Sequence, residues 1–152
     1  MSRSQTDTLT VRDLMSTKLT TVSPSTTVGK ALDLMFERKI SALPVVDEGR
    51  CVGIVTTTDL VALLRATDKV LRSEYPHHDD CSGAVELVQR KLDNDPVREI
   101  MSEEMMTTTP DTPAADVAKM MSDESIHHLV VQQEGKLVGF LSSLVFLRAW
   151  KD

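Results

Sequence analysis

One cluster and two pairs of residues in the chain have side-chain types and a spacing that could bind a ligand. The cluster is His77-His78-Asp79-Asp80-Cys81, and zinc binds to side chains of these kinds. Adjacent residues of an extended segment point in opposite directions, so these five side chains do not converge on one ion. We therefore expect an exposed segment here and no metal site.

The first pair is Thr56 and Asp59. A threonine followed three positions later by an acidic residue is typical of a capping box at the start of a helix. The same carboxylate has two acceptor oxygens, and it can receive charge-assisted hydrogen bonds from the two hydroxyl groups of a diol. The pair is therefore a helix cap, a ligand site, or both.

The second pair is His127 and His128. An imidazole donates a hydrogen bond whether it is neutral or charged, and a nearby phosphate favours its charged form. The pair is either a set of phosphate donors or two solvated side chains at a strand edge. The sequence has no phosphate-cradling glycine-rich loop, no Gly-x-Ser-x-Gly motif and no paired-histidine metal motif, so we expect no catalytic residues and no enzyme activity.

The sequence pattern that surrounds these residues occurs twice. A shift of 86 positions places residues 11–60 on residues 97–146 without a gap, and 15 of these 50 positions are identical. Ordinary residue frequencies would give about 3 identities. Two copies of a unit too small to bury its own core are expected to pack together with pseudo-two-fold symmetry.

Each copy has the same predicted order of elements, β-α-β-β-α, which defines an α/β (α+β) fold. A short strand precedes a helix, which we expect Thr26 and Thr112 to cap. Two apolar strands follow, and a glycine in the turn between them suits the positive φ of a hairpin. The predicted strands are 19–22, 42–46 and 51–55 in the first copy, and 105–109, 129–131 and 137–141 in the second. A last helix begins near Thr57 and near Ser143.

The repeat divides the chain into three predicted parts. A first repeat with its N-terminal segment covers 1–66, a linker covers 67–96, and a second repeat covers 97–152. The linker is expected to be partly helical because apolar residues recur at helical spacing at Ala84, Leu87, Val88 and Leu92.

Composition narrows the class of protein. Apolar residues make up 41% and charged residues 26% of the chain, as in ordinary globular proteins. The net charge of −6 disfavours nucleic-acid binding, because the phosphate backbone is itself negative. The sequence has no signal peptide and no membrane-spanning stretch, so we expect a cytoplasmic protein. Cys51 lies in an apolar pattern and is expected to be a small core residue.

Four segments together resemble a tandem pair of cystathionine-β-synthase-type (CBS) domains, also called a Bateman module. They are Val-Arg-Asp/Glu-Leu/Ile-Met-Ser at 11–16 and 97–102, then residues 40–47, and then residues 52–60. The resemblance implies an adenosine-containing ligand: AMP, ADP, ATP, S-adenosylmethionine, NAD or a diadenosine phosphate. It also implies a regulatory role and a homodimer.

The family motif Gly-x-hydrophobic-Thr/Ser-x-x-Asp is complete in the first copy, at Gly53, Thr56 and Asp59. The resemblance implies that Asp59 accepts hydrogen bonds from the ribose hydroxyls and that Thr56 lies near the sugar. The second copy has Ser142 but carries Val145 in place of the aspartate, so its ribose contact is lost.

The resemblance implies two further parts of the site. The adenine is expected to lie against the first two strands of the first copy, at Thr20, Thr21, Val22, Ala42 and Pro44. In some family members a basic pair at the position of His127 and His128 reaches the ligand phosphates, although those proteins have further basic residues where this chain has Leu144 and Val145.

Two functions fit these features. The first is a regulatory module that binds an adenosine nucleotide and modulates an unidentified partner protein. The second is a structural module that dimerises without a ligand. Either is expected to dimerise through the last helices of the repeats, which carry the apolar residues Leu60, Val61, Leu63, Leu64, Val145, Phe146, Leu147 and Trp150.

Overall fold

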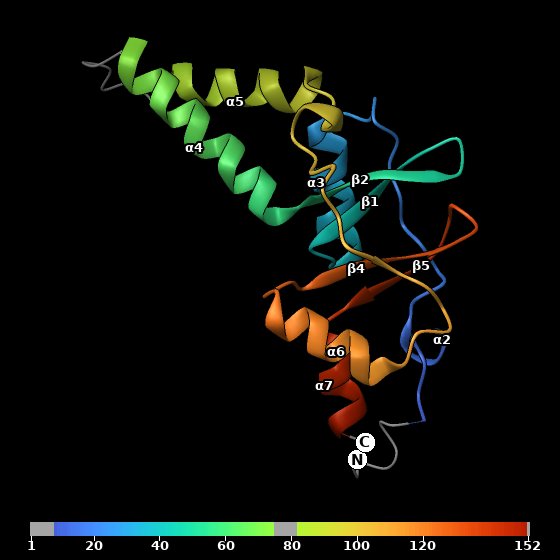
Figure 1. Ribbon diagram of the computed structural model, residues 1–152. Helices are drawn as coiled ribbons and strands as arrows, with labels where there is room; N and C mark the ends of the chain where they lie inside the picture. Colours follow the sequence, from blue (N-terminus) through green and yellow to red (C-terminus); the bar gives the residue numbers. More distant parts are fainter. Residues whose placement is uncertain (1–7, 75–81, 152) are drawn as a thin grey trace. The chain divides into compact units, whose positions relative to one another are not determined.

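The computed structural model describes residues 8–74 and 82–151 (Figure 1). The cluster at 77–81 lies outside the described residues, and its interpretation as an exposed segment stays a prediction. The contacts within the chain divide it into two compact units. Unit 1 contains the described residues of 1–20, 48–51 and 104–152, and unit 2 contains those of 21–47 and 52–103.

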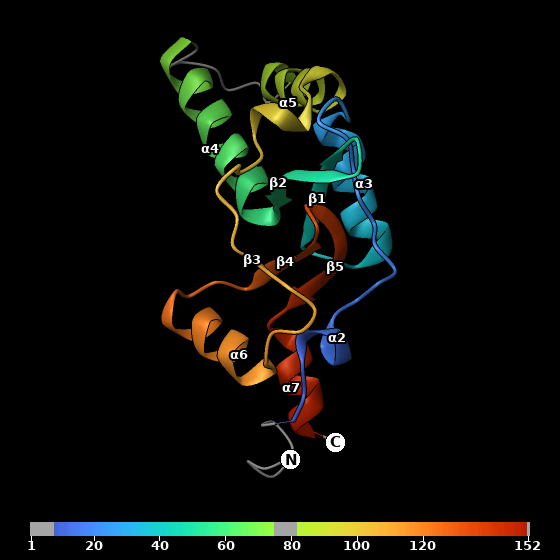
Figure 2. The same ribbon diagram turned by 45° about the vertical axis from the view of Figure 1, so that its right-hand side comes forward.

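Unit 2 is built around a helix and two strands of the first repeat. Helix α3 (Val28–Arg38) precedes strand β1 (Ala42–Asp47), which forms a two-stranded sheet with β2 (Arg50–Thr56). Helices α4 (Thr57–Glu74) and α5 (Ser82–Asn94) follow and contact each other, and they diverge at an angle in both ribbon views (Figures 1 and 2). The short 3-10 helix η1 (Val97–Glu99) ends this part of the chain.

The core of unit 2 is aliphatic, as the low aromatic content predicts. Its buried members come from one face of α3, from alternate residues of β1, from β2, α4 and η1, and from the segment beside β1: Val22, Val28, Ala31, Met35, Leu43, Val45, Val55, Leu60 and Val97. Helix α5 packs closely on α3. A Cβ atom at Gly29 would lie 2.8 Å from the carbonyl oxygen of Leu92, so the glycine leaves room for this contact.

Unit 1 contains the body of the second repeat. Helices α2 (Val11–Leu14), α6 (Ala114–Asp123) and α7 (Leu144–Lys151) accompany a three-stranded sheet of order β3-β4-β5. Strand β3 (Thr107–Thr108) runs parallel to β4 (His128–Gln133), which pairs antiparallel with β5 (Lys136–Ser142). The buried core of this unit is formed by Val11, Val117, Met121, Leu129, Val131 and Leu141.

Unit 1 joins the start of the first repeat to the body of the second. The backbones of Ser16 and Phe140 exchange two hydrogen bonds of 2.8 and 3.0 Å. The Val11 N–H donates to the Thr112 carbonyl at 2.9 Å, and the Val11 side chain is fully buried in the core of this unit. Residues 8–16 therefore complete the second repeat, and we call them its leading segment.

Unit 2 shows the same arrangement with the repeats exchanged. Ser102 and Ile54 exchange two backbone hydrogen bonds of 2.9 and 3.0 Å, and the Val97 N–H donates to the Thr26 carbonyl at 2.8 Å. Each of these contacts is the counterpart of one in unit 1 under the shift of 86 positions. Residues 95–102 are therefore the leading segment of the first repeat, and the two repeats exchange their leading segments.

The exchange explains a glycine of the family motif. A Cβ atom at Gly53 would lie 2.8 Å from Met101 Sδ and 2.9 Å from the Ser102 carbonyl oxygen. At the equivalent Gly139 it would lie 2.5 Å from Met15 Sδ. Each glycine lets a leading segment approach strand β2 or β5 closely, so this motif residue has a packing role.

The predicted hairpins and helices are confirmed, and so are the strands predicted at 42–46, 51–55, 129–131 and 137–141. The strand predicted at 105–109 is reduced to Thr107–Thr108, and the one predicted at 19–22 is reduced to an isolated bridge between Val22 and Val45. Both hairpin turns contain two consecutive residues with positive φ, which are Glu48 and Gly49 (51° and 79°) and Glu134 and Gly135 (54° and 78°). This is the geometry of a type I′ turn, whose twist matches that of the paired strands.

The predicted helix caps are wrong. The side chain of Thr27, not that of Thr26, accepts a hydrogen bond from the Lys30 N–H at 3.3 Å at the start of α3. Thr26 Oγ1 instead accepts from the Ser23 N–H at 3.0 Å, which closes the turn before the helix. In the second repeat Pro113 precedes α6, and no side chain caps that helix. Several hydroxyl residues in a row compete for one cap, and their spacing alone does not select among them.

Within the described residues, none of the helices combines the length and the hydropathy needed to cross a bilayer.

Candidate functional site

Thr56 and Asp59 form the junction between strand β2 and helix α4. Asp59 Oδ2 accepts a hydrogen bond from the Thr56 N–H at 2.7 Å and another from Thr56 Oγ1 at 3.2 Å. The bond from the Thr56 N–H is the one that the acidic residue of a capping box accepts, as the spacing predicts. Both residues are half-buried, and both bonds use the same oxygen of the carboxylate. Asp59 Oδ1 makes no hydrogen bond within the described part of the chain and is available to a hydroxyl donor.

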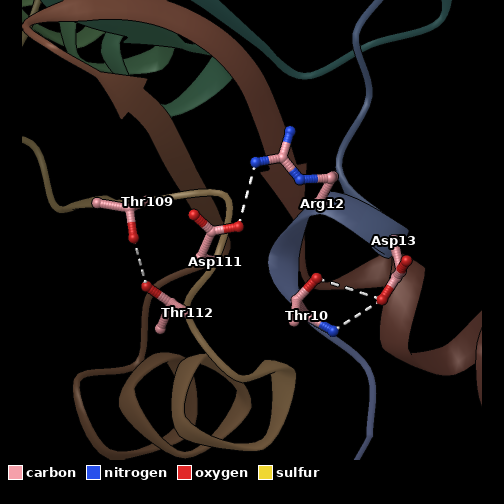
Figure 3. A network of polar contacts seen from close by, with 6 residues as sticks. All are labelled: Thr10, Arg12, Asp13, Thr109, Asp111 and Thr112. Carbon is pink, nitrogen blue, oxygen red and sulfur yellow. Dashed lines mark hydrogen bonds and ion pairs between the residues drawn. The ribbon is translucent and has the colours of Figure 1, made fainter.

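A second capping box in the molecule provides a reference for the first. In the leading segment of unit 1, Asp13 Oδ2 accepts from the Thr10 N–H at 2.9 Å and from Thr10 Oγ1 at 3.2 Å (Figure 3). Asp13 does not follow a strand that carries the motif, so it caps a helix without belonging to the candidate site. Removing Asp13 would show how much folding stability the loss of a helix cap costs. Removing Asp59 would in addition remove the proposed ligand contact.

Val22, in the segment predicted as the first strand of the repeat, lies beside β1 and forms an isolated parallel bridge with Val45. The Val22 N–H donates to the Pro44 carbonyl at 3.1 Å, and the Val22 carbonyl accepts from the Val46 N–H at 2.8 Å. The side chain of Val22 belongs to the core of unit 2. Val22 therefore has neither a backbone group nor a side chain available to a ligand, and its role is to hold the strand in place.

Thr21 differs from Val22 because its side chain is exposed and its backbone makes no hydrogen bond to another backbone group in the described chain. Ala42 and Pro44 are buried, and by strand alternation they lie on the face of β1 opposite to the core residues Leu43 and Val45. Thr21 therefore has an exposed side chain and no backbone partner, whereas Ala42 and Pro44 are small apolar residues that the folded chain already covers.

A backbone hydrogen bond connects the start of α4 to the start of β1. The Thr57 N–H donates to the Ser41 carbonyl at 3.0 Å, which fixes the capping box beside the strand that carries Ala42. The second repeat has the equivalent bond, from the Ser143 N–H to the His127 carbonyl at 2.9 Å. The sequence gives no signal for this contact, because it involves backbone groups only.

His127 and His128 lie at the start of β4 in unit 1. The side chain of His127 is exposed, whereas His128 is half-buried and its ring stacks on that of Phe140, with 5.7 Å between the centroids and 17° between the planes. Burial lowers the pKa of His128 below its ordinary value of 6.5, and the neighbouring His127 lowers it further. Folding therefore favours the neutral imidazole, and this contribution to stability is present above pH 6.5 and is lost as the pH falls through the lowered pKa.

The predicted site residues fall into two groups. Unit 2 contains Thr21, Val22, Ala42, Pro44, Thr56 and Asp59, and unit 1 contains Thr20, His127 and His128. The contacts of unit 2 bring the capping box and strand β1 together, and strand β1 holds Val22. In the second repeat, the position of Asp59 is occupied by Val145, which packs against the core of unit 1.

A sequence profile of the CBS domain matches residues 11–66 and 97–152. The chain therefore belongs to the CBS domain family and contains a tandem pair of these domains. It is 29% identical over 132 residues to the CBS domain-containing protein YhcV of Bacillus subtilis, covering 87% of this chain and 79% of that protein. It is 32% identical to CBSX1, a chloroplastic protein of Arabidopsis thaliana, of whose length it spans 63%.

Two solved structures with similar folds contain adenosyl ligands. CBSX2 in complex with AMP is 29% identical, with a TM-score of 0.70, and the match covers 93% of this chain and 96% of that one. The CBS domain pair of protein MJ0100 in complex with 5′-methylthioadenosine and S-adenosylmethionine is 26% identical, with a TM-score of 0.68, over 94% of this chain and 96% of that one. Similar CBS pairs thus bind ligands that share an adenosine group.

Proposed function

We propose that this CBS pair binds an adenosine nucleotide through its first repeat and uses the bound ligand to regulate a partner protein. The observation that carries the proposal is the half-buried carboxylate of Asp59, which has one oxygen in a capping box and the other available. The AMP complex of CBSX2 supports the same class of ligand. The protein itself would carry out no catalysis and would not bind nucleic acid.

The roles of the remaining residues follow from their positions. We propose that Asp59 Oδ1 accepts from a ribose hydroxyl, that Thr56 lies beside the sugar, and that Thr20 and Thr21 offer backbone groups to the adenine edge. Ala42 and Pro44 would cover the faces of the base, with Val22 supporting the strand. His127 and His128 would donate to phosphate oxygens.

A ligand panel tests the proposed function directly. Wild-type protein is expected to melt at a higher temperature with at least one of AMP, ADP, ATP, S-adenosylmethionine or NAD, because a ligand that binds only the folded state stabilises it by mass action. Guanosine nucleotides at equal concentration are the control for non-specific phosphate effects. A protein whose melting temperature ignores the whole adenosine panel would favour the alternative function, a structural module without a ligand.

We further propose that the protein is a homodimer that buries apolar side chains of its last helices. Val61 and Leu64 on α4 are 56% and 51% exposed, and Leu144 and Leu147 on α7 are 54% and 67% exposed. Leu60 is buried, and Leu63, Val145 and Phe146 are half-buried, so they support these surfaces from beneath. The side chain of Trp150 lies outside the described residues. Exposed apolar patches of this kind are typical of subunit interfaces.

Sedimentation velocity tests the dimer. Wild-type protein is expected to sediment as a dimer, and Leu64→Glu combined with Leu147→Glu is expected to shift it to a monomer, because the charges would have to be buried at the interface. Phe36→Glu is the matched control, since Phe36 is 84% exposed but lies on α3. A wild-type monomer, or loss of the dimer in the Phe36 variant alone, would contradict the proposed interface.

A further inference from the structure

Two arginines occupy equivalent positions in the leading segments. Under the shift of 86 positions Arg12 corresponds to Arg98. The Arg12 N–H donates to the Pro110 carbonyl at 2.9 Å, and the Arg98 N–H donates to the Pro24 carbonyl at 3.1 Å. Each arginine is therefore held, by the same backbone contact, beside the turn that precedes the first helix of a repeat.

In unit 1 this arginine has an acidic partner. Arg12 Nη2 forms an ion pair of 3.1 Å with Asp111 Oδ1, and Asp111 directly follows the proline to which Arg12 is bonded (Figure 3). Together with the backbone bond, the ion pair ties the leading segment to the turn before α6. The fold thus accommodates an anionic group at the position of Asp111, where it pairs with Arg12.

In unit 2 the acidic partner is absent. The residue that corresponds to Asp111 is Ser25, which directly follows Pro24 and is exposed. Its hydroxyl lies 3.1 Å from Ser23 Oγ, so the side chain lies at the surface of the turn. Arg98 is exposed and forms no ion pair or side-chain hydrogen bond with any residue in the described ranges. Unit 2 therefore has the same arginine and the same backbone contact as unit 1. It has the hydroxyl of Ser25 at the position where unit 1 has the carboxylate of Asp111.

We propose that Ser25 is a phosphorylation site whose phosphate group is received by Arg98. A phosphoserine carries a charge of about −1.5 to −2 at neutral pH and pairs strongly with arginine, whose planar donors suit phosphate oxygens. In the reaction, Ser25 Oγ forms a bond to the terminal phosphorus of a nucleoside triphosphate, and the bond from that phosphorus to the bridging oxygen breaks. The nucleoside diphosphate leaves, and the hydroxyl proton passes to a base of a protein serine kinase.

The modification would act on the leading segment of the first repeat. Residues 95–102 already contact the turn through the bonds from Val97 to Thr26 and from Arg98 to Pro24. A phosphate on Ser25 adds a side-chain bond across the same contact, as Asp111 does in unit 1. Phosphorylation is therefore expected to hold this leading segment more firmly on its repeat, independently of whether the protein binds a nucleotide.

The test compares full-length protein with phosphoserine incorporated at position 25 in the wild-type and Arg98→Gln backgrounds. Urea unfolding should show a folding equilibrium constant raised roughly 3- to 10-fold by the phosphate, and the gain should disappear with Arg98→Gln. The matched cycle in unit 1, Asp111→Ser with and without Arg12→Gln, measures the existing ion pair. Inorganic phosphate added to unmodified protein should not reproduce the gain. A phosphate effect of equal size in both Arg98 backgrounds would overturn the assignment of the partner.

Phosphopeptide mapping of the protein isolated from its own cells tests the modification itself. The proposal expects a phosphate on Ser25 that is absent from cells expressing Ser25→Ala. An unmodified Ser25 in growing, starved and stressed cells alike would overturn it.

Discussion

Replacing Asp59 with alanine is expected to weaken AMP binding by roughly 30- to 150-fold, or about 2–3 kcal/mol. The reason is the loss of the charge-assisted bonds between the ribose hydroxyls and the carboxylate, whose Oδ1 is available while Oδ2 caps α4. Isothermal titration calorimetry measures the change. Asp59→Asn keeps the shape and one acceptor oxygen, so its affinity is expected to lie between those of the wild type and Asp59→Ala.

The second capping box supplies the control for this variant. Asp59→Ala also removes a cap, which typically costs about 1 kcal/mol of folding stability. Asp13→Ala removes the matching bonds to Thr10 and should cost similar stability without changing affinity. A 2′-deoxy nucleotide should bind the wild type poorly and lose little more in Asp59→Ala, because the two defects share one interaction. Equal affinities of folded Asp59→Ala and wild type would return Asp59 to the role of a helix cap.

Replacing both His127 and His128 with alanine is expected to abolish the preference for AMP over adenosine. Hydrogen bonds to a charged group contribute about 1.5–3 kcal/mol, so the wild type should prefer AMP by roughly ten- to a hundred-fold. Adenosine binding should be nearly unchanged, which makes it the internal control for damage to the rest of the site. Calorimetry with the two ligands on the wild type, the single variants and the double variant provides the comparison.

The pH dependence distinguishes the two histidines. Burial lowers the pKa of His128, so this imidazole is neutral in the free protein near neutral pH. A bound phosphate favours the protonated form, so AMP binding should take up a proton and tighten as the pH falls toward 6.5, whereas adenosine binding should not. His128→Ala should weaken this pH dependence. Equal binding of AMP and adenosine by the wild type would rule out both histidines as phosphate donors.

Much of the fold could be predicted because the sequence contains it twice. The hairpin turns, the helices and the capping box depend on local patterns, such as a glycine between apolar strands and the spacing of Thr56 and Asp59. The exchange of leading segments could not be predicted in this way. It depends on contacts such as that of Ser16 with Phe140, which are far apart in the sequence and use backbone groups.

The candidate site was predicted in part for the same reason. Asp59 and Thr56 lie together because they are neighbours on one turn of chain. The side chain of Val22 belongs to the core, which strand patterns alone do not distinguish from a ligand contact. The stacking of His128 on Phe140 joins two strands of a sheet, so only the strand register reveals it.

A crystal structure of the protein with AMP would show where the nucleotide binds. We expect AMP at the first repeat, with a ribose hydroxyl within hydrogen-bond distance of Asp59 Oδ1 and the adenine against the backbone of Thr21. AMP bound with its ribose away from Asp59, or a protein that stays empty at saturating AMP and at saturating concentrations of the other adenosine ligands, would contradict this expectation.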